Sequence, residues 1–431
     1  MKDREGIGKA LDTVIFGGRV WTEEETWESV AVGIRGNRVA VLGSAEELEK
    51  QTSPETEWVD VKGGWVLSGF RETNLHLLAK PEAFRGERTA STPADAKPGI
   101  WQRIFGRKKF RATGLEGNFP FRSAVGESEA ERWESAVLKV QEEALRQGVT
   151  RLECDEAVGP EGFRVLWRVL EGLEKRNALR IRFSLSVCIP SIDAFMDFLQ
   201  NGLRTGTGST RVRMGAVRVH AGPEERGSRE ELKRLSYLVH ANGFQLVFRP
   251  ISGSSLTEVF HALLHARTHP EGLMTKHRIC FPPVFNESVL YASKELSAIL
   301  EMSPDWLAGI WKPLREKRHP ERCMDMYDWL TTERLLRICP PGEFGSPLQL
   351  IRNAAEETIG ILSGENPGMA SDRIEHAARL SAMQAVTAPV QSGQPADLAV
   401  LDADPLSVPL PALPEASVRL TVVDGEAVYR R

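Results

Sequence analysis

The sequence has no long apolar run: no window approaches the roughly 18 uninterrupted apolar residues that a membrane-spanning helix needs. Its first residues also lack the apolar stretch that is typical of a signal peptide. With 55 basic and 59 acidic side chains the net charge is −4, which gives no overall positive field to attract nucleic acid or anionic lipid. We therefore expect a cytoplasmic protein that binds neither nucleic acid nor membrane.

Cysteine is also scarce. The chain has 5 cysteines, an odd number, and they are far apart in the sequence, with no C-x-x-C pair. This spacing argues against a disulfide scaffold and against a zinc-ribbon site. The cysteines are Cys154, Cys188, Cys280, Cys323 and Cys339.

Both ends of the chain are rich in strand patterns. Near the start, residues 29–34 and 38–42 flank Arg35-Gly36-Asn37, which is typical of a hairpin turn. Near the end, residues 418–423 and 426–429 flank Asp424-Gly425 in the same way. Since neither end has enough strands for a stable sandwich alone, we predict that residues 1–65 and 391–431 form one composite β-sandwich domain.

The middle of the chain alternates between helix and strand patterns. A helical period over residues 128–147 precedes an apolar strand at 149–154, and the alternation continues to residue 281. This pattern predicts parallel βα units, enough for most of a barrel, with any site at the C-terminal ends of the strands. Residues 79–125 follow neither period, and we interpret them as an irregular insertion.

Four stretches carry a resemblance to a known family. They are Gly64–Phe70, Arg146–Thr150, Lys276–Ile279 and Gly393–Asp402, of which the last, G-Q-P-A-D-L-A-V-L-D, is the most specific. The chain resembles the amidohydrolase superfamily, and within it the branch called amidohydrolase family 3. The resemblance implies an α/β fold, a (β/α)8 TIM-like barrel over residues 66–390 with a small β-sandwich built from the N- and C-terminal segments. It also implies hydrolysis of C–N bonds by water activated by divalent metal.

The positions that match the metal ligands of this family are mostly degenerate. His76 matches one histidine of the family's H-x-H, but Asn74 stands at the other. Arg249 and Phe281 stand where two further histidines belong, and Pro341 lies in the run where the family's aspartate belongs. Because too few donors remain for ordinary metal affinity, we expect no metal cofactor.

These departures leave two functions open. In the first, metal-dependent hydrolysis is lost and the protein binds a small-molecule ligand or a partner. Arg218, Arg249 and Arg278 then converge on an anionic ligand, or Arg249 pairs with Glu72 inside the vacated site.

In the second, the chain is an active hydrolase of non-peptide C–N bonds, with a divalent metal such as zinc in a rebuilt site. The candidate catalytic residues are then Glu72, His76 and Glu343, together with His277. Whether the protein is an enzyme stays open on the sequence alone, as does the formation of a homo-oligomer or of a complex with an active relative.

Overall fold

The structure is a computed structural model, and the residues that it describes are 10–22, 27–75, 77, 128–155, 159–221, 229–269, 276–283, 287–304, 336–338, 346–363 and 371–431. The insertion predicted at residues 79–125 lies outside these segments, as do His76, Pro341 and Glu343. No helix within the described segments combines the length and the apolar character that a membrane crossing requires.

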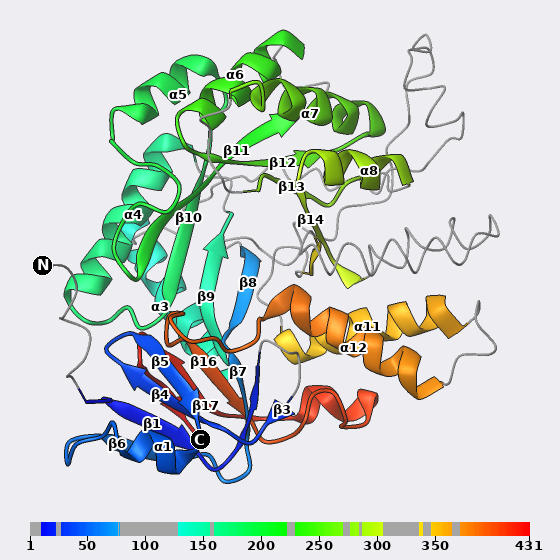
Figure 1. The fold of residues 1–431 in the computed structure, drawn as a ribbon. Coiled ribbons are helices and arrows are strands. Elements are labelled where there is room, and N and C mark those ends of the chain that lie inside the picture. Colours follow the sequence, from blue (N-terminus) through cyan, green and yellow to red (C-terminus); the bar gives the residue numbers. More distant parts are fainter. Residues whose placement is uncertain are drawn as a thin grey trace, which may run out of the picture.

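Eight parallel strands form the central sheet, in the spatial order β8 to β15, and the sheet curves into a nearly closed barrel (Figure 1). The strands are β8 (Phe70–Leu75), β9 (Val149–Cys154), β10 (Arg182–Cys188), β11 (Val212–Ala221), β12 (Gln245–Pro250), β13 (Arg278–Cys280), β14 (Ile299–Met302) and β15 (Leu336–Ile338). Neighbouring strands in space are also neighbours in sequence, as a succession of βα units requires.

Helices connect these strands or follow the last of them, and they lie along the outside of the barrel (Figure 1). They are α3 (Glu129–Arg146), α4 (Pro160–Lys175), α5 (Ile192–Leu199), α6 (Arg229–Ala241), α7 (Gly253–Ala266), α8 (Glu287–Glu295), α11 (Pro347–Ser363) and α12 (Ser371–Val386). In α3 the Ser128 side chain accepts from the backbone N–H of Glu131, whose carboxylate accepts from Ser128 in return, which fixes the first turn. Trp133 and Val137, one turn apart, are buried on the inner face of this helix.

Two further sheets form the small domain. One has the order β5-β4-β1-β6 and the other β18-β17-β16-β7-β2-β3. Their strands are β1 (Thr13–Phe16), β2 (Arg19–Trp21), β3 (Trp27–Glu28), β4 (Ala31–Arg35), β5 (Arg38–Gly43), β6 (Glu57–Asp60), β7 (Trp65–Ser68), β16 (Leu398–Leu401), β17 (Val418–Val423) and β18 (Glu426–Arg430). A short helix, α1 (Ala45–Glu49), follows β5, and a 3-10 helix, η2 (Leu410–Glu415), precedes β17.

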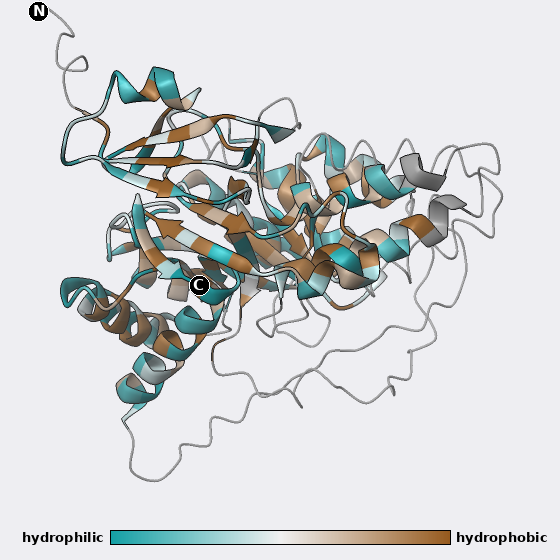
Figure 2. Cartoon of the chain, turned by 90° about the horizontal axis from the view of Figure 1, so that it is seen from below, coloured by the Kyte–Doolittle hydropathy of each residue, from teal (hydrophilic) through white to brown (hydrophobic). Residues whose placement is uncertain are grey.

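The second of these sheets joins the two ends of the chain, because β7 pairs antiparallel with β16. Apolar residues of both sheets, among them Val32, Val66 and Leu398, pack into one buried cluster. The strands in Figure 2 are accordingly largely brown, the colour of hydrophobic residues. The predicted fold class, a TIM-like barrel with a small β-sandwich built from both ends of the chain, is confirmed. Since β7 belongs to this sheet, the sheet continues beyond residue 65, where the sequence predicts the domain to end.

Candidate functional site

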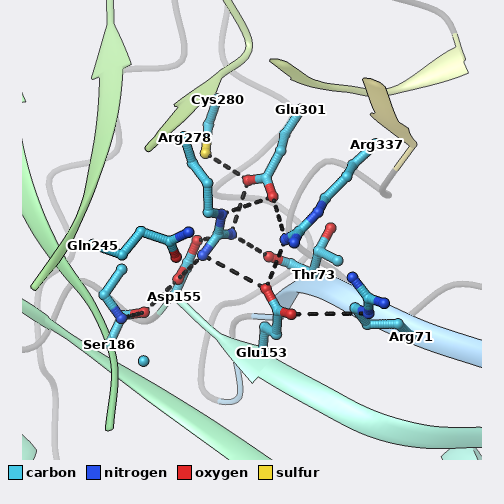
Figure 3. Close-up of polar contacts among 12 residues, drawn as sticks. Arg71, Thr73, Glu153, Asp155, Ser186, Gln245, Arg278, Cys280, Glu301 and Arg337 are labelled. Atoms are coloured by element: carbon cyan, nitrogen blue, oxygen red, sulfur yellow. Dashed lines mark hydrogen bonds and ion pairs between the residues drawn. The ribbon is translucent and has the colours of Figure 1, made fainter. Parts of the chain in front are cut away.

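Arg278 of β13 lies at the centre of a buried polar network (Figure 3). Its Nε is 2.8 Å from Glu301 Oε1 and its Nη2 is 2.8 Å from Glu301 Oε2, so this carboxylate is contacted at both oxygens. The same Nη2 is 2.7 Å from Oδ2 of Asp155 and 2.7 Å from the carbonyl oxygen of Thr73. One guanidinium therefore connects a carboxylate of β14 with a carboxylate that directly follows β9.

Further ion pairs extend this network toward β15 and β8. Arg337 Nη1 lies 3.0 Å from Glu153 Oε2 and 3.3 Å from Glu301 Oε1. Glu153 also lies 3.6 Å from Nη1 of Arg278 and 4.0 Å from Nε of Arg71. These contacts join three guanidinium groups (Arg71, Arg278, Arg337) to three carboxylates (Glu153, Asp155, Glu301), which balances the formal charges of the paired groups.

The electrostatics of the network follow from burial and from these pairings. Burial opposes ionisation of Glu153, but Arg337, Arg278 and Arg71 outweigh it and lower the pKa of this carboxyl to about 2. Burial, together with the Glu301 carboxylate, raises the pKa of Asp155, although Arg278 acts in the opposite direction. Since burial alone would favour loss of the guanidinium charge, it is the surrounding carboxylates that raise the pKa of Arg278. Arg278 therefore remains a cation.

Cys280 and the two carboxylates around Arg278 form the one group of metal-donor residues found in the described part of the chain. Their donor atoms lie within 4.8 Å of one another. However, the Cys280 thiol donates to Glu301 Oε2 at 2.9 Å, and burial and the Glu301 carboxylate raise the pKa of this thiol well above its ordinary value. A metal would need the thiolate, and would meet the Arg278 guanidinium at hydrogen-bond distance from both carboxylates. The three residues therefore do not fit a divalent metal while Arg278 keeps this position.

Arg218 and Arg249 lie on neighbouring strands at the same end of the barrel. Arg218 is buried in β11 and donates from Nη1 to the carbonyl oxygen of Asp155 at 2.7 Å. Arg249 of β12 lies with its guanidinium carbon 5.0 Å from the ring centroid of Phe281. Arg218 and Arg278 thus meet at Asp155, and the role of the three arginines in binding an anion stays a prediction.

Strand β13 ends at Cys280, one residue earlier than the sequence predicts, because of the backbone conformation of Phe281. Its φ of +50° lies in the left-handed region, which interrupts the strand after Cys280. The backbone N–H of Phe281 donates to the carbonyl oxygen of Glu301 at 2.8 Å, and its ring is buried beneath Arg249. An aromatic ring therefore occupies the strand end where the family resemblance implies a histidine.

The remaining predicted site residues are placed as follows. Glu72 is buried in β8, and Asn74 lies in the same strand. His277 precedes β13, and its ring contacts His240 of α6, so it does not join the network around Arg278. Its inclusion in a rebuilt catalytic site stays a prediction, although the residue before an inward-pointing arginine on a strand points to the opposite face.

Sequence reasoning did not identify Asp155, Glu301 or Arg337. Two of them have a recognisable sequence signal: Asp155 directly follows a buried strand, and Glu301 interrupts the apolar run Ile299–Met302. A charged residue inside a short buried strand requires a partner of opposite charge. Here that partner is Arg278, and Arg337 of the adjacent strand adds a second contact.

A cavity of about 350 Å³ lies away from this network, between the end of α3, the start of α11 and the last two strands. Arg146, Leu348, Tyr429 and Arg431 contribute to its lining. It contains none of the residues around Arg278 and is not at the C-terminal strand ends, where βα barrels bind their ligands. We therefore assign the candidate site to the network and not to this cavity.

Comparison with known proteins rests on structure, because neither the family models nor the curated proteins compared with the chain give a match. A triazine hydrolase variant superposes with a TM-score of 0.62 at 15% identity, over 97% of this chain and 94% of that one. An uncharacterised metal-dependent hydrolase from Pyrococcus furiosus gives 0.61 at 15% identity, over 92% and 100%. An adenosine deaminase from Xanthomonas campestris with bound zinc gives 0.58 at 13% identity, over 97% and 93%.

These neighbours are metal-dependent hydrolases of the amidohydrolase superfamily. At such low identities the likeness concerns the fold and not the chemistry of the site. The resemblance predicted from the sequence is confirmed at this level: the chain has the fold of the amidohydrolase superfamily.

Proposed function

We propose that this chain is an amidohydrolase-fold protein that has lost metal-dependent hydrolysis and acts by binding a small-molecule ligand or a partner. The observation that carries the proposal is the Arg278 guanidinium between the carboxylates of Asp155 and Glu301. A permanent cation of the chain itself thereby balances two buried carboxylates that would otherwise repel each other.

Charge balance supports the proposal. The network pairs three guanidinium groups with three carboxylates, and the buried Arg218 also contacts Asp155, so a divalent ion would add two positive charges to a buried region whose carboxylates already have cationic partners. Burying an ion without partners of opposite charge costs free energy, and this cost weakens the binding of the metal. The protonated Cys280 thiol adds a further cost, because a metal binds the thiolate.

The alternative is an active metal-dependent hydrolase of non-peptide C–N bonds. The spacing of Asp155, Cys280 and Glu301, whose donor atoms lie within 4.8 Å of one another, favours a site for zinc. The zinc-containing adenosine deaminase with this fold supports it as well. This alternative requires Arg278 to move away from both carboxylates.

Metal content separates the two functions. Purified protein is dialysed against zinc-free buffer after incubation with zinc, and bound metal is measured by mass spectrometry for wild type, Arg278→Ala and Arg337→Ala. We expect well under one equivalent in wild type and in Arg337→Ala, because Arg278 keeps its position in both. Arg278→Ala should retain zinc, since its donors then lack a competing cation.

Arg337→Ala is the matched control, because it removes an arginine that contacts the same Glu301 from the next strand. About one equivalent of zinc in the wild-type protein after dialysis would contradict the proposal and favour the hydrolase. This wild-type result decides between the functions even if Arg278→Ala does not fold. A cytoplasmic location and self-association remain predictions from the sequence.

A further inference from the structure

Cys188 and His220 form a thiol–imidazole pair that is separate from the carboxylates around Arg278. The distance from Cys188 Sγ to His220 Nε2 is 2.9 Å. Cys188 is the last residue of β10, and His220 lies one residue before the end of β11. Both therefore lie at the C-terminal end of the barrel, where enzymes with this architecture place their reacting groups.

The pair differs from the other described cysteines in exposure. Cys188 has 7% of its surface exposed and His220 is an exposed residue, whereas Cys154 and Cys280 are 0% and 1% exposed. A small reagent can therefore approach the pair from the mouth of the barrel more readily than it can approach the other two thiols.

Two arginines lie beside this pair. In the parallel register Cys188 is opposite Arg218, and His220 is opposite Arg249. Although part of the His220 side chain is exposed, the protein atoms that cover the rest of the ring and the charges of Arg218 and Arg249 together lower the pKa of His220 to about 4. The imidazole is consequently neutral at pH 7, and its Nε2 can accept a hydrogen bond from the Cys188 thiol when the ring carries its own proton on Nδ1, but with so low a pKa it is too weak a base to keep the thiol proton.

The arginines also give the pair a preference for negative charge. Arg218 uses Nη1 for the carbonyl oxygen of Asp155, and its Nε has no acceptor within the described part of the chain. A buried donor without an acceptor favours a ligand that brings one. Two guanidinium groups next to the thiol would orient a carboxylate and raise its local concentration.

We propose that Cys188 is a nucleophile for small electrophiles that carry a carboxylate, with His220 as its hydrogen-bond partner and Arg249 as the group that attracts the anion. In the reaction Sγ forms a bond to the electrophilic carbon, and the bond from that carbon to the leaving group breaks. The leaving group departs with the electron pair, and the thiol proton passes to solvent water. The inference goes beyond ligand binding and requires no metal.

The test compares two alkylating reagents of nearly equal size, iodoacetate, which is an anion, and iodoacetamide, which is neutral. Each reacts with the full-length wild-type chain in the presence of a chelator, and peptide mass spectrometry gives the rate at each cysteine. At each cysteine the rate with iodoacetate is divided by the rate with iodoacetamide, and this ratio in the folded protein is then divided by the same ratio in urea. We expect this quotient to be about tenfold or more at Cys188, with iodoacetate favoured.

Variants assign the roles. Arg249→Gln should abolish the preference for iodoacetate while iodoacetamide still reacts at Cys188. His220→Gln should keep the preference for iodoacetate, because Arg218 and Arg249 remain in place. Arg213→Gln is the matched control: this arginine is exposed and also in β11, but it lies near the start of the strand, at the other end of the barrel from Cys188, and the substitution should leave both rates unchanged.

The proposal is overturned if Cys188 in the folded wild type reacts no faster than Cys154 and Cys280, or if the quotient is close to one. Both results come from the wild-type chain, so they do not depend on the folding of a variant. Because the chelator removes metal from every reaction, the outcome is also independent of the zinc measurement. Either proposal can therefore fail while the other stands.

Discussion

His277, which precedes β13, takes part with His240 of α6 in a chain of hydrogen bonds that requires neutral imidazoles. Its Nδ1 accepts from the backbone N–H of Leu246 at 3.0 Å, so its proton is on Nε2, which lies 3.0 Å from Nδ1 of His240. The Nε2 of His240 in turn lies 3.4 Å from the carbonyl oxygen of His269. Burial lowers the pKa of His277 to about 3, and His240 and Arg267 contribute to this shift. The residue therefore has a structural explanation that involves no substrate.

This arrangement predicts a loss of stability in acid. Between pH 6.5 and about 3 the unfolded chain binds a proton at His277 that the folded chain does not, so the free energy of unfolding falls as the pH falls. For wild type we expect a contribution of about 2–3 kcal/mol to be lost between pH 7 and pH 4.5. His277→Gln, which can keep both hydrogen bonds without titrating, should lose less over the same range.

Urea unfolding at the two pH values measures this difference. His376→Gln serves as the control, because His376 is exposed on α12 and should behave as wild type. An equal acid loss in His277→Gln and in wild type would show that the hydrogen-bonded histidine chain does not govern the acid response.

At the scale of whole elements, Arg182 ties the start of β10 to the small domain. Its Nε lies 2.5 Å from Oδ2 of Asp397, and its guanidinium also contacts Asp424 in the turn between β17 and β18. Asp397 additionally accepts from the backbone N–H of Asp424 at 3.0 Å. Asp397 is the first of two aspartates in the motif Gly393–Asp402 that carries the strongest family resemblance, so this part of the motif has a physical role in joining barrel and sheet.

Asp397→Asn should therefore destabilise the fold. The substitution keeps the shape of the side chain but removes half of the negative charge that Arg182 contacts, and breaking a buried ion pair in this way costs about 3 kcal/mol. Glu426→Gln is a suitable control, because Glu426 pairs with Arg211 at the surface and is 74% exposed. We expect no measurable change for the control, since exposed ion pairs contribute little.

Urea midpoints for the two variants test this link between domains. If Asp397→Asn unfolds at the same urea concentration as Glu426→Gln, the contact with Arg182 does not stabilise the assembly.

At the scale of the whole molecule, the elements with strong periodicity could be predicted from the sequence. The apolar runs at 149–154 and 212–220 are strands, and the helical period at 128–147 is α3 with Ser128 as its cap. By contrast, the strand Ile299–Met302 is only 4 residues long and contains Glu301, so the pattern of its side chains gave no clear strand signal.

The candidate site could be predicted only in part. Degenerate ligand positions such as Arg249 and Phe281 can be recognised in the sequence. The sequence also predicts that a guanidinium pairs with a carboxylate inside the barrel. In the structure Arg278 makes such pairs with Asp155 and Glu301. Contacts between strands that are distant in sequence depend on strand register and on barrel closure, and one sequence does not determine either.

The central claim is that the Arg278 guanidinium occupies the position that a cation would take between Asp155 and Glu301. Crystals of the wild-type chain grown with zinc, with diffraction data collected on both sides of the zinc absorption edge, test it most directly. We predict no anomalous peak within coordinating distance of these carboxylates, and density for Arg278 between them. A zinc peak bound by Asp155, Cys280 and Glu301, with Arg278 turned away, would contradict it.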